Sequence, residues 1–188
     1  MIVRLTTLGL LLFAATANAT QLTLVRSCQL DDGSQVALLA EPTVEGNRFH
    51  LKIDGAVGTA FDDMPDTDVI GNVALAKCVD RSLVFAISYG PPYLKGAVVR
   101  KNPVSHRLER IDFSEKALPR WLYVNSREMQ LVIPNIGHEV ASRYLVYRYS
   151  AADGQSLEPA ARDTLPSGRG FEKLEISRQM PYGPGRDK

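Results

Sequence analysis

The chain has 188 residues, of which 45% are hydrophobic and 23% are charged. Its 22 basic and 21 acidic side chains nearly cancel, which excludes the basic excess of a nucleic-acid-binding protein and the acidic tail of a protein with a basic partner. A domain of this size buries roughly 70% of the surface of its unfolded chain, so it needs neither a metal nor a partner to fold.

The first nineteen residues predict a secretory signal peptide. Arg4 supplies a positive charge, an apolar run follows from Leu5 to Ala15, and Ala17–Ala19 places small residues at the positions that signal peptidase reads. The run is shorter than the ~20 apolar residues that cross a bilayer. The residue directly after the cut is Thr20 and not the cysteine that would carry a lipid. We therefore expect the signal peptide to span 1–19 and the mature chain to begin at Thr20, in a bacterial periplasm and without a membrane anchor.

The two cysteines, Cys28 and Cys78, predict one disulfide. An isolated pair in an oxidising compartment most simply forms a bridge, and the C-x-x-C spacing of a redox site is absent. Neither sulfur is then available as a nucleophile.

The mature chain begins with a pattern typical of a three-strand meander. Every second residue from Leu22 to Leu30 is apolar except Arg26, which predicts a strand with these side chains on one face. The turn and the returning strands are expected at 31–34, 36–40 and 49–53.

Later strands are expected in two blocks of similar layout, roughly 47 residues apart: 69–79, 82–89, 96–101 and 108–113, then 121–124, 129–133, 144–149 and a strand near Leu157. Such a repeat is typical of propeller blades, but any meander of hairpins has a similar layout. We therefore expect one all-β domain over 20–177, built from antiparallel meander blocks and arranged as a sandwich or a partial β-propeller. Only 114–118 and 139–143 could hold a helical turn, and 178–188 predicts a disordered tail.

The sequence holds few residues suited to catalysis. Its three histidines, His50, His106 and His138, stand alone in their segments. Ser105 or Ser126 with His138 and an aspartate would complete a hydrolytic triad, yet the G-x-S-x-G elbow is absent and serines are common in turns. We expect no catalytic residues and no enzyme activity.

One acidic segment has residues that could coordinate calcium. Asp62–Asp68 places four carboxylates within seven residues, but it lacks the glycine and the distal glutamate of an EF-hand loop. The H-E-x-x-H pair of a zinc enzyme is also absent. We interpret the segment as a solvated acidic loop, with calcium as the alternative, and expect no metal and no cofactor.

Two loops carry residue types suited to binding a protein. Tyr89–Lys95 combines two prolines with two tyrosines; proline lowers the entropy lost on binding, and tyrosine offers a large contact area with few rotors. The loop 135–139 has the same place in the next block, so the two loops share an edge if the blocks are equivalent. In the alternative interpretation, the prolines and glycines only end strands. The predicted partner-binding residues are Tyr89, Tyr93, Leu94, Lys95, Asn135 and His138.

The leader, the size, the β-rich blocks and the protruding loops together resemble the periplasmic immunity proteins that neutralise type VI secretion effectors such as peptidoglycan amidases. The resemblance implies an inhibitor of another exported protein, which binds the catalytic cleft of a toxin with loops 89–95 and 135–139. Two other classes stay open: a cell-envelope hydrolase, and a structural or assembly component of the envelope.

Overall fold

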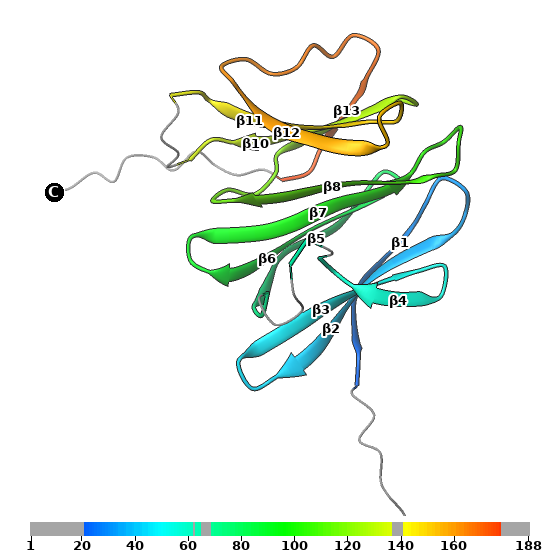
Figure 1. Cartoon of the computed structure of the whole chain (residues 1–188), viewed down its shortest axis with the longest axis vertical. Coiled ribbons are helices and arrows are strands. Elements are labelled where there is room, and N and C mark those ends of the chain that lie inside the picture. Colours follow the sequence, from blue (N-terminus) through cyan, green and yellow to red (C-terminus); the bar gives the residue numbers. More distant parts are fainter. Residues whose placement is uncertain (1–20, 62, 65–68, 137–140, 178–188) are drawn as a thin grey trace, which may run out of the picture.

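The computed structural model describes residues 21–61, 63–64, 69–136 and 141–177, and these residues form three antiparallel β-sheets without a helix (Figure 1). Sheet A contains β1–β4, sheet B contains β5–β8, and sheet C has the order β12-β11-β10-β9-β13. The strands are β1 (Thr23–Gln29), β2 (Gln35–Thr43), β3 (Gly46–Ile53), β4 (Ala56–Thr59), β5 (Asn72–Val79), β6 (Ser82–Gly90), β7 (Tyr93–Lys101), β8 (Leu108–Glu115), β9 (Trp121–Val124), β10 (Glu128–Pro134), β11 (Tyr144–Ser150), β12 (Gln155–Arg162) and β13 (Glu172–Glu175).

The predicted all-β fold of antiparallel meanders is confirmed, in the form of three stacked sheets. Each of the first two sheets is a four-strand meander, and sheet C adds β13, which returns to pair with β9. The helical turn considered at 114–118 does not form, because Ser114 and Glu115 complete β8. The predicted signal peptide, the predicted tail and three of the aspartates of the acidic segment (62, 66 and 68) lie outside the described residues. Within the described part, no helix is long and apolar enough to cross a membrane.

Sheet B lies in the middle of the stack (Figure 1), and its central strands β6 and β7 are buried on both faces. Along β6, Leu83, Phe85 and Ile87 pack against sheet A in what we call the A–B core. The alternate residues Val84 and Ala86 pack against sheet C in the B–C core. A strand covered on both sides has no solvent face, which explains why β6 is continuously apolar rather than alternating.

A β-bulge in β1 changes which side chains reach the A–B core. The register of β1 against β2 shifts between Leu24 and Arg26, and an extra residue in one strand reverses the alternation beyond it. Leu24 therefore lies opposite Leu39 on the outer face and is 60% exposed, whereas Cys28 is buried. The expectation that Leu22 to Leu30 share one face is wrong for its first half.

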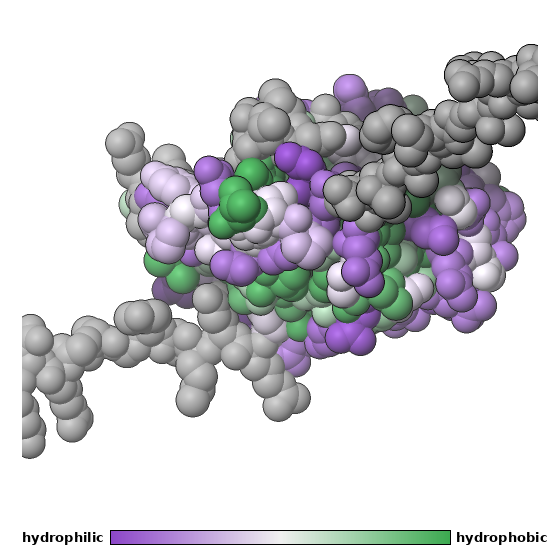
Figure 2. Space-filling view, turned by 90° about the horizontal axis from the view of Figure 1, so that it is seen from below, coloured by the Kyte–Doolittle hydropathy of each residue, from purple (hydrophilic) through white to green (hydrophobic). Residues whose placement is uncertain are grey.

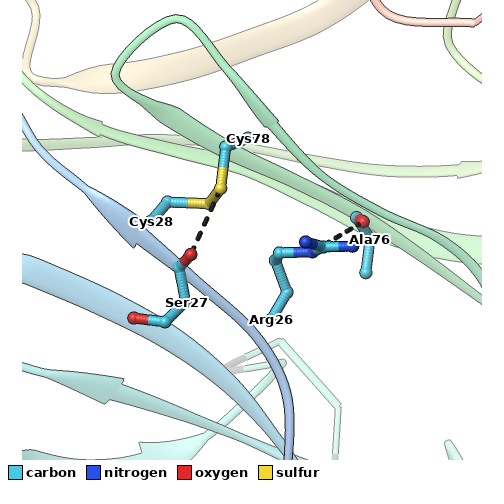
Figure 3. Close-up of a disulfide and its surroundings, with 5 residues drawn as sticks. All are labelled: Arg26, Ser27, Cys28, Ala76 and Cys78. Carbon is cyan, nitrogen blue, oxygen red and sulfur yellow. Dashed lines mark hydrogen bonds between the residues drawn. A yellow bond between two sulfur atoms is a disulfide. The ribbon is translucent and has the colours of Figure 1, made fainter.

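The predicted disulfide is confirmed and joins two neighbouring sheets (Figure 3). Cys28 on β1 and Cys78 on β5 are the bonded pair, so the bridge ties the first strand of sheet A to the first strand of sheet B. Beside it, Arg26 Nε donates to the Ala76 carbonyl at 3.3 Å. This bond explains how an arginine interrupts the apolar pattern of β1: it lies at the sheet edge and reaches the neighbouring sheet.

Removing the disulfide should lower the free energy of unfolding. The bridge spans a sequence separation of 50 residues, and the chain-entropy relation gives about 4 kcal/mol for a loop of that size. Urea denaturation of the Cys28→Ser/Cys78→Ser double variant checks this value. A reducing agent should produce the same loss in the wild type and none in the double variant; an unchanged midpoint in the reduced wild type would contradict the prediction.

Candidate protein-binding site

Three equivalent strand connections lie at one end of the stack, which we call the loop end (Figure 1). They are the β2–β3 turn at 44–45, the β6–β7 turn at 91–92 and the β10–β11 connection at 135–143. Sheets A and B meet closely here: Asn47 forms a bridge with Gly71, and a Cβ on Gly71 would lie 2.0 Å from the Ser88 carbonyl oxygen. Glycine is therefore required at position 71, because this residue bridges to Asn47 of sheet A while its Cα lies against the backbone of Ser88 on β6.

Among the described residues at the loop end, three large hydrophobic side chains are exposed in or beside the connections. Val44 is fully exposed, Tyr93 is 49% exposed and Ile136 is 46% exposed. Sequence reasoning found Tyr93 but missed Val44 and Ile136. An apolar residue in a tight turn, as in Thr43-Val44-Glu45-Gly46, is the signal that would have identified Val44, since turn tips are usually polar.

The two predicted tyrosines lie at the base of the β6–β7 turn. The Tyr89 hydroxyl lies 3.3 Å from Ser114 Oγ, and the Tyr89 ring packs partly against the A–B core. The Tyr93 ring faces the Lys116 ammonium, whose Nζ lies 5.8 Å from the ring centroid. The turn itself consists only of Pro91 and Pro92, so both rings stand on strand backbone that belongs to sheet B.

Leu94 and Lys95 lie within β7, below the tip. Leu94 is half-buried, and Lys95 is buried, with its ammonium paired to Asp63 and 5.8 Å from the centre of the Phe61 ring. Lys95 thus holds Phe61 and Asp63 beside sheet B. Its charge is satisfied inside the molecule, so of these two residues Leu94 is the one nearer to the surface.

Asn135 closes the base of the β10–β11 connection. Its backbone N–H donates to the Arg143 carbonyl at 2.9 Å, and its Nδ2 donates to the Ser142 carbonyl at 2.7 Å. These bonds fix the two ends of the connection to each other. His138, the remaining predicted contact residue, lies outside the described residues.

A buried pair lies between β8 and β11. The Tyr147 hydroxyl donates to the Glu115 carboxylate. Desolvation, followed by the neighbouring carboxylate, raises the pKa of Tyr147 far above its ordinary value, so the hydroxyl stays protonated and remains a donor. The pair ties sheet B to sheet C in the described part of the chain.

The opposite end of the stack is held together by ion pairs. Lys101 Nζ lies 2.7 Å from a carboxylate oxygen of Asp32 and 2.7 Å from one of Asp54, and Arg81 pairs with Asp31 at 3.4 Å. These ion pairs connect turns of sheet A to turns and strands of sheet B.

A buried polar network extends this end from sheet B to sheet C. Arg100 Nε donates to Glu109 Oε2 at 2.7 Å, and Asn102 Nδ2 donates to Glu109 Oε1 at 2.8 Å. Arg100 and Asn102 also donate to the carbonyls of Asn125 (2.9 Å) and Ser126 (2.7 Å) in the β9–β10 turn. Because each charged group has a partner, the network fixes the two sheets without an unpaired buried charge.

The residues considered for catalysis are dispersed in the described structure. His50 Nε2 lies 2.7 Å from Glu41 Oε2 on sheet A, whereas His106 lies in the β7–β8 turn with a φ of 54°. Ser105 and Ser126 lie in turns at the opposite end, where Ser105 Oγ accepts from the Arg107 N–H at 3.4 Å. Among the described residues, no group of three His, Cys, Asp or Glu side chains could hold a metal ion.

The outer face of sheet A has no covering layer among the described residues. It contains a hollow of about 510 Å³ lined by Leu24, Ala37 and Leu39 with Lys52 and Asp54 at its border. Figure 2 views the molecule from this side: hydrophobic residues gather in the middle of the visible surface, with hydrophilic residues around them.

Comparison with protein-family models, with curated proteins and with solved structures gives no match for this chain.

Acidification should weaken the charged end of the stack. The Lys101 ammonium and the Ser34 hydroxyl hold the pKa of Asp32 well below its ordinary 3.8. As the pH falls below 3.8, the folded state therefore binds fewer protons than the unfolded state. The stabilisation that the ionised Asp32 carboxylate gives above pH 3.8 is then lost. Urea midpoints measured from pH ~6 down to ~2.5 should fall more steeply for the wild type than for Asp32→Asn or Lys101→Met. Equal slopes for the three proteins would contradict the assignment.

Proposed function

We propose that this protein is an exported, periplasmic inhibitor of the immunity type, which binds and blocks the active site of a secreted toxin such as a peptidoglycan hydrolase. The observation that carries the proposal is the loop end, where Val44, Tyr93 and Ile136 are exposed in or directly beside three equivalent connections. Exposed apolar and aromatic side chains on a rigid support are the usual anchors of a protein interface.

The support beneath these side chains favours insertion into a preformed cleft. The β2–β3 and β6–β7 connections are two-residue turns on long strands, and Asn135 closes the base of the third connection. A surface that is already ordered loses little conformational entropy when it binds. The leader sequence and the disulfide agree with a periplasmic location.

Capture of the partner tests the proposal. The mature chain, residues 20–188, is immobilised and exposed to a periplasmic extract, and the bound protein is identified by mass spectrometry. We expect one exported hydrolase, whose activity on peptidoglycan falls when an equimolar amount of the mature chain is added. A captured hydrolase that keeps its full activity would refute the inhibitor assignment.

Truncation of the tips should weaken binding to the captured partner. Val44→Ala, Tyr93→Ala and Ile136→Ala each remove an exposed side chain, and we expect at least one of them to raise Kd by about 5-fold or more, the equivalent of ~1 kcal/mol. Val104→Ala is the matched control, because Val104 is also exposed but lies in the β7–β8 turn at the opposite end. Wild-type affinity in all three tip variants would exclude the loop end as the contact surface.

A second candidate, a structural or assembly component of the envelope, is favoured by the open outer face of sheet A. Leu24 and Val57 are exposed there beside the hollow described above. This function predicts self-association of the mature chain, which light scattering measures and which Leu24→Asp should abolish. A monomer at all concentrations, with inhibition of the captured hydrolase, would decide for the first candidate.

A further inference from the structure

A second cavity lies on the face of sheet C that is turned away from sheet B. Its volume is about 570 Å³, within the range of small-molecule sites. It separates β10–β12 from the segment 163–171, which we call the strap and which crosses above sheet C (Figure 1). The strand floor and the strap both contribute apolar side chains: Val146, Leu157, Ala160, Leu165, Pro166 and Phe171.

The strap is anchored, so the cavity exists before any ligand arrives. The Phe171 ring packs edge-on against Tyr123 with 6.5 Å between centroids, and Asn125 Nδ2 donates to the Gly170 carbonyl at 3.1 Å. Leu165 packs against a small cluster of buried residues on the outer face of sheet C. These contacts fix both halves of the strap to sheet C beside the cavity.

The rim of the cavity carries an excess of positive charge. Arg148 is committed to Glu128 by two hydrogen bonds of 2.5 and 2.8 Å. Arg162 and Arg169 are exposed, and in the described parts of the chain no ion pair joins either guanidinium to a carboxylate. Glu158 is the single acidic residue among the described lining residues, so the two arginines are not neutralised.

We propose that this cavity binds an amphiphilic anion, with a carboxylate or phosphate head paired to Arg162 and Arg169 and an apolar body lying against Leu157 and the strap. Guanidinium groups match the geometry of carboxylate and phosphate oxygens and form charge-assisted hydrogen bonds with them. The hydroxyls of Thr164 and Ser167 on the strap add polar partners at the rim. A bare anion would leave the apolar lining in contact with water, so an apolar body is part of the assignment.

Calorimetric titration of the mature chain with four probes tests the proposal. Octanoate and octyl phosphate carry both parts of the ligand, inorganic phosphate carries the head alone, and octyl glucoside carries the apolar chain without charge. We expect at least one octyl anion to bind with one molecule per chain and more tightly than either single-part probe. Binding of only one of the two octyl anions supports the site and identifies its head group.

Substitutions at the rim locate the binding. Arg162→Gln and Arg169→Gln should each raise Kd tenfold or more at unchanged thermal midpoint, whereas Arg107→Gln, at an exposed arginine of the β7–β8 turn, should leave Kd unchanged. Equal affinity for phosphate and octyl phosphate would overturn the apolar part of the proposal, and equal affinity for octyl glucoside would overturn the anionic part. An absence of binding, or binding that is unaffected by both rim variants, would overturn the site itself.

Discussion

The burial of the central strands of sheet B on both faces is the constraint on which the rest of the structure depends. A sheet whose strands carry apolar residues on both sides must be covered twice, and sheets A and C supply the two covers. Each cover is itself a meander that follows its neighbour directly in the chain. Successive meanders of the same direction place equivalent connections at the same end, so the loop end is a consequence of how the core is buried.

The two ends of the stack differ in physical character. At one end, ion pairs and the Arg100–Glu109 network join turns of successive sheets. At the other end, the contacts that join the sheets lie beneath the surface, as in the Tyr147–Glu115 pair, and the tips extend beyond them. The molecule is therefore fixed at one end and presents side chains at the other, an arrangement that suits recognition of a second macromolecule.

The strand pattern and the disulfide could be predicted from the sequence because both depend on local signals: alternation, turn residues and an isolated cysteine pair. The expectations that were wrong concern residues whose environment is set by distant parts of the chain. The bulge beside Leu24 reversed the alternation without any compositional mark, and Lys95, a charged residue in a predicted loop, is buried by a carboxylate 32 positions away. The strap cavity could not be predicted from the sequence, because it exists only where the segment 163–171 crosses the folded sheet C.

The return of β13 to the edge of β9 makes the last strand of sheet C essential to two sheets. Sheet C gains its last strand, and the B–C core gains the buried side chain of Ile176, from residues near the C-terminus. The Ile176 carbonyl also accepts a hydrogen bond of 2.9 Å from Lys77 in sheet B. Sheets B and C are therefore joined by the segment 172–176. A chain interrupted before Glu172 would leave the β9 edge without its partner and the B–C core without Ile176.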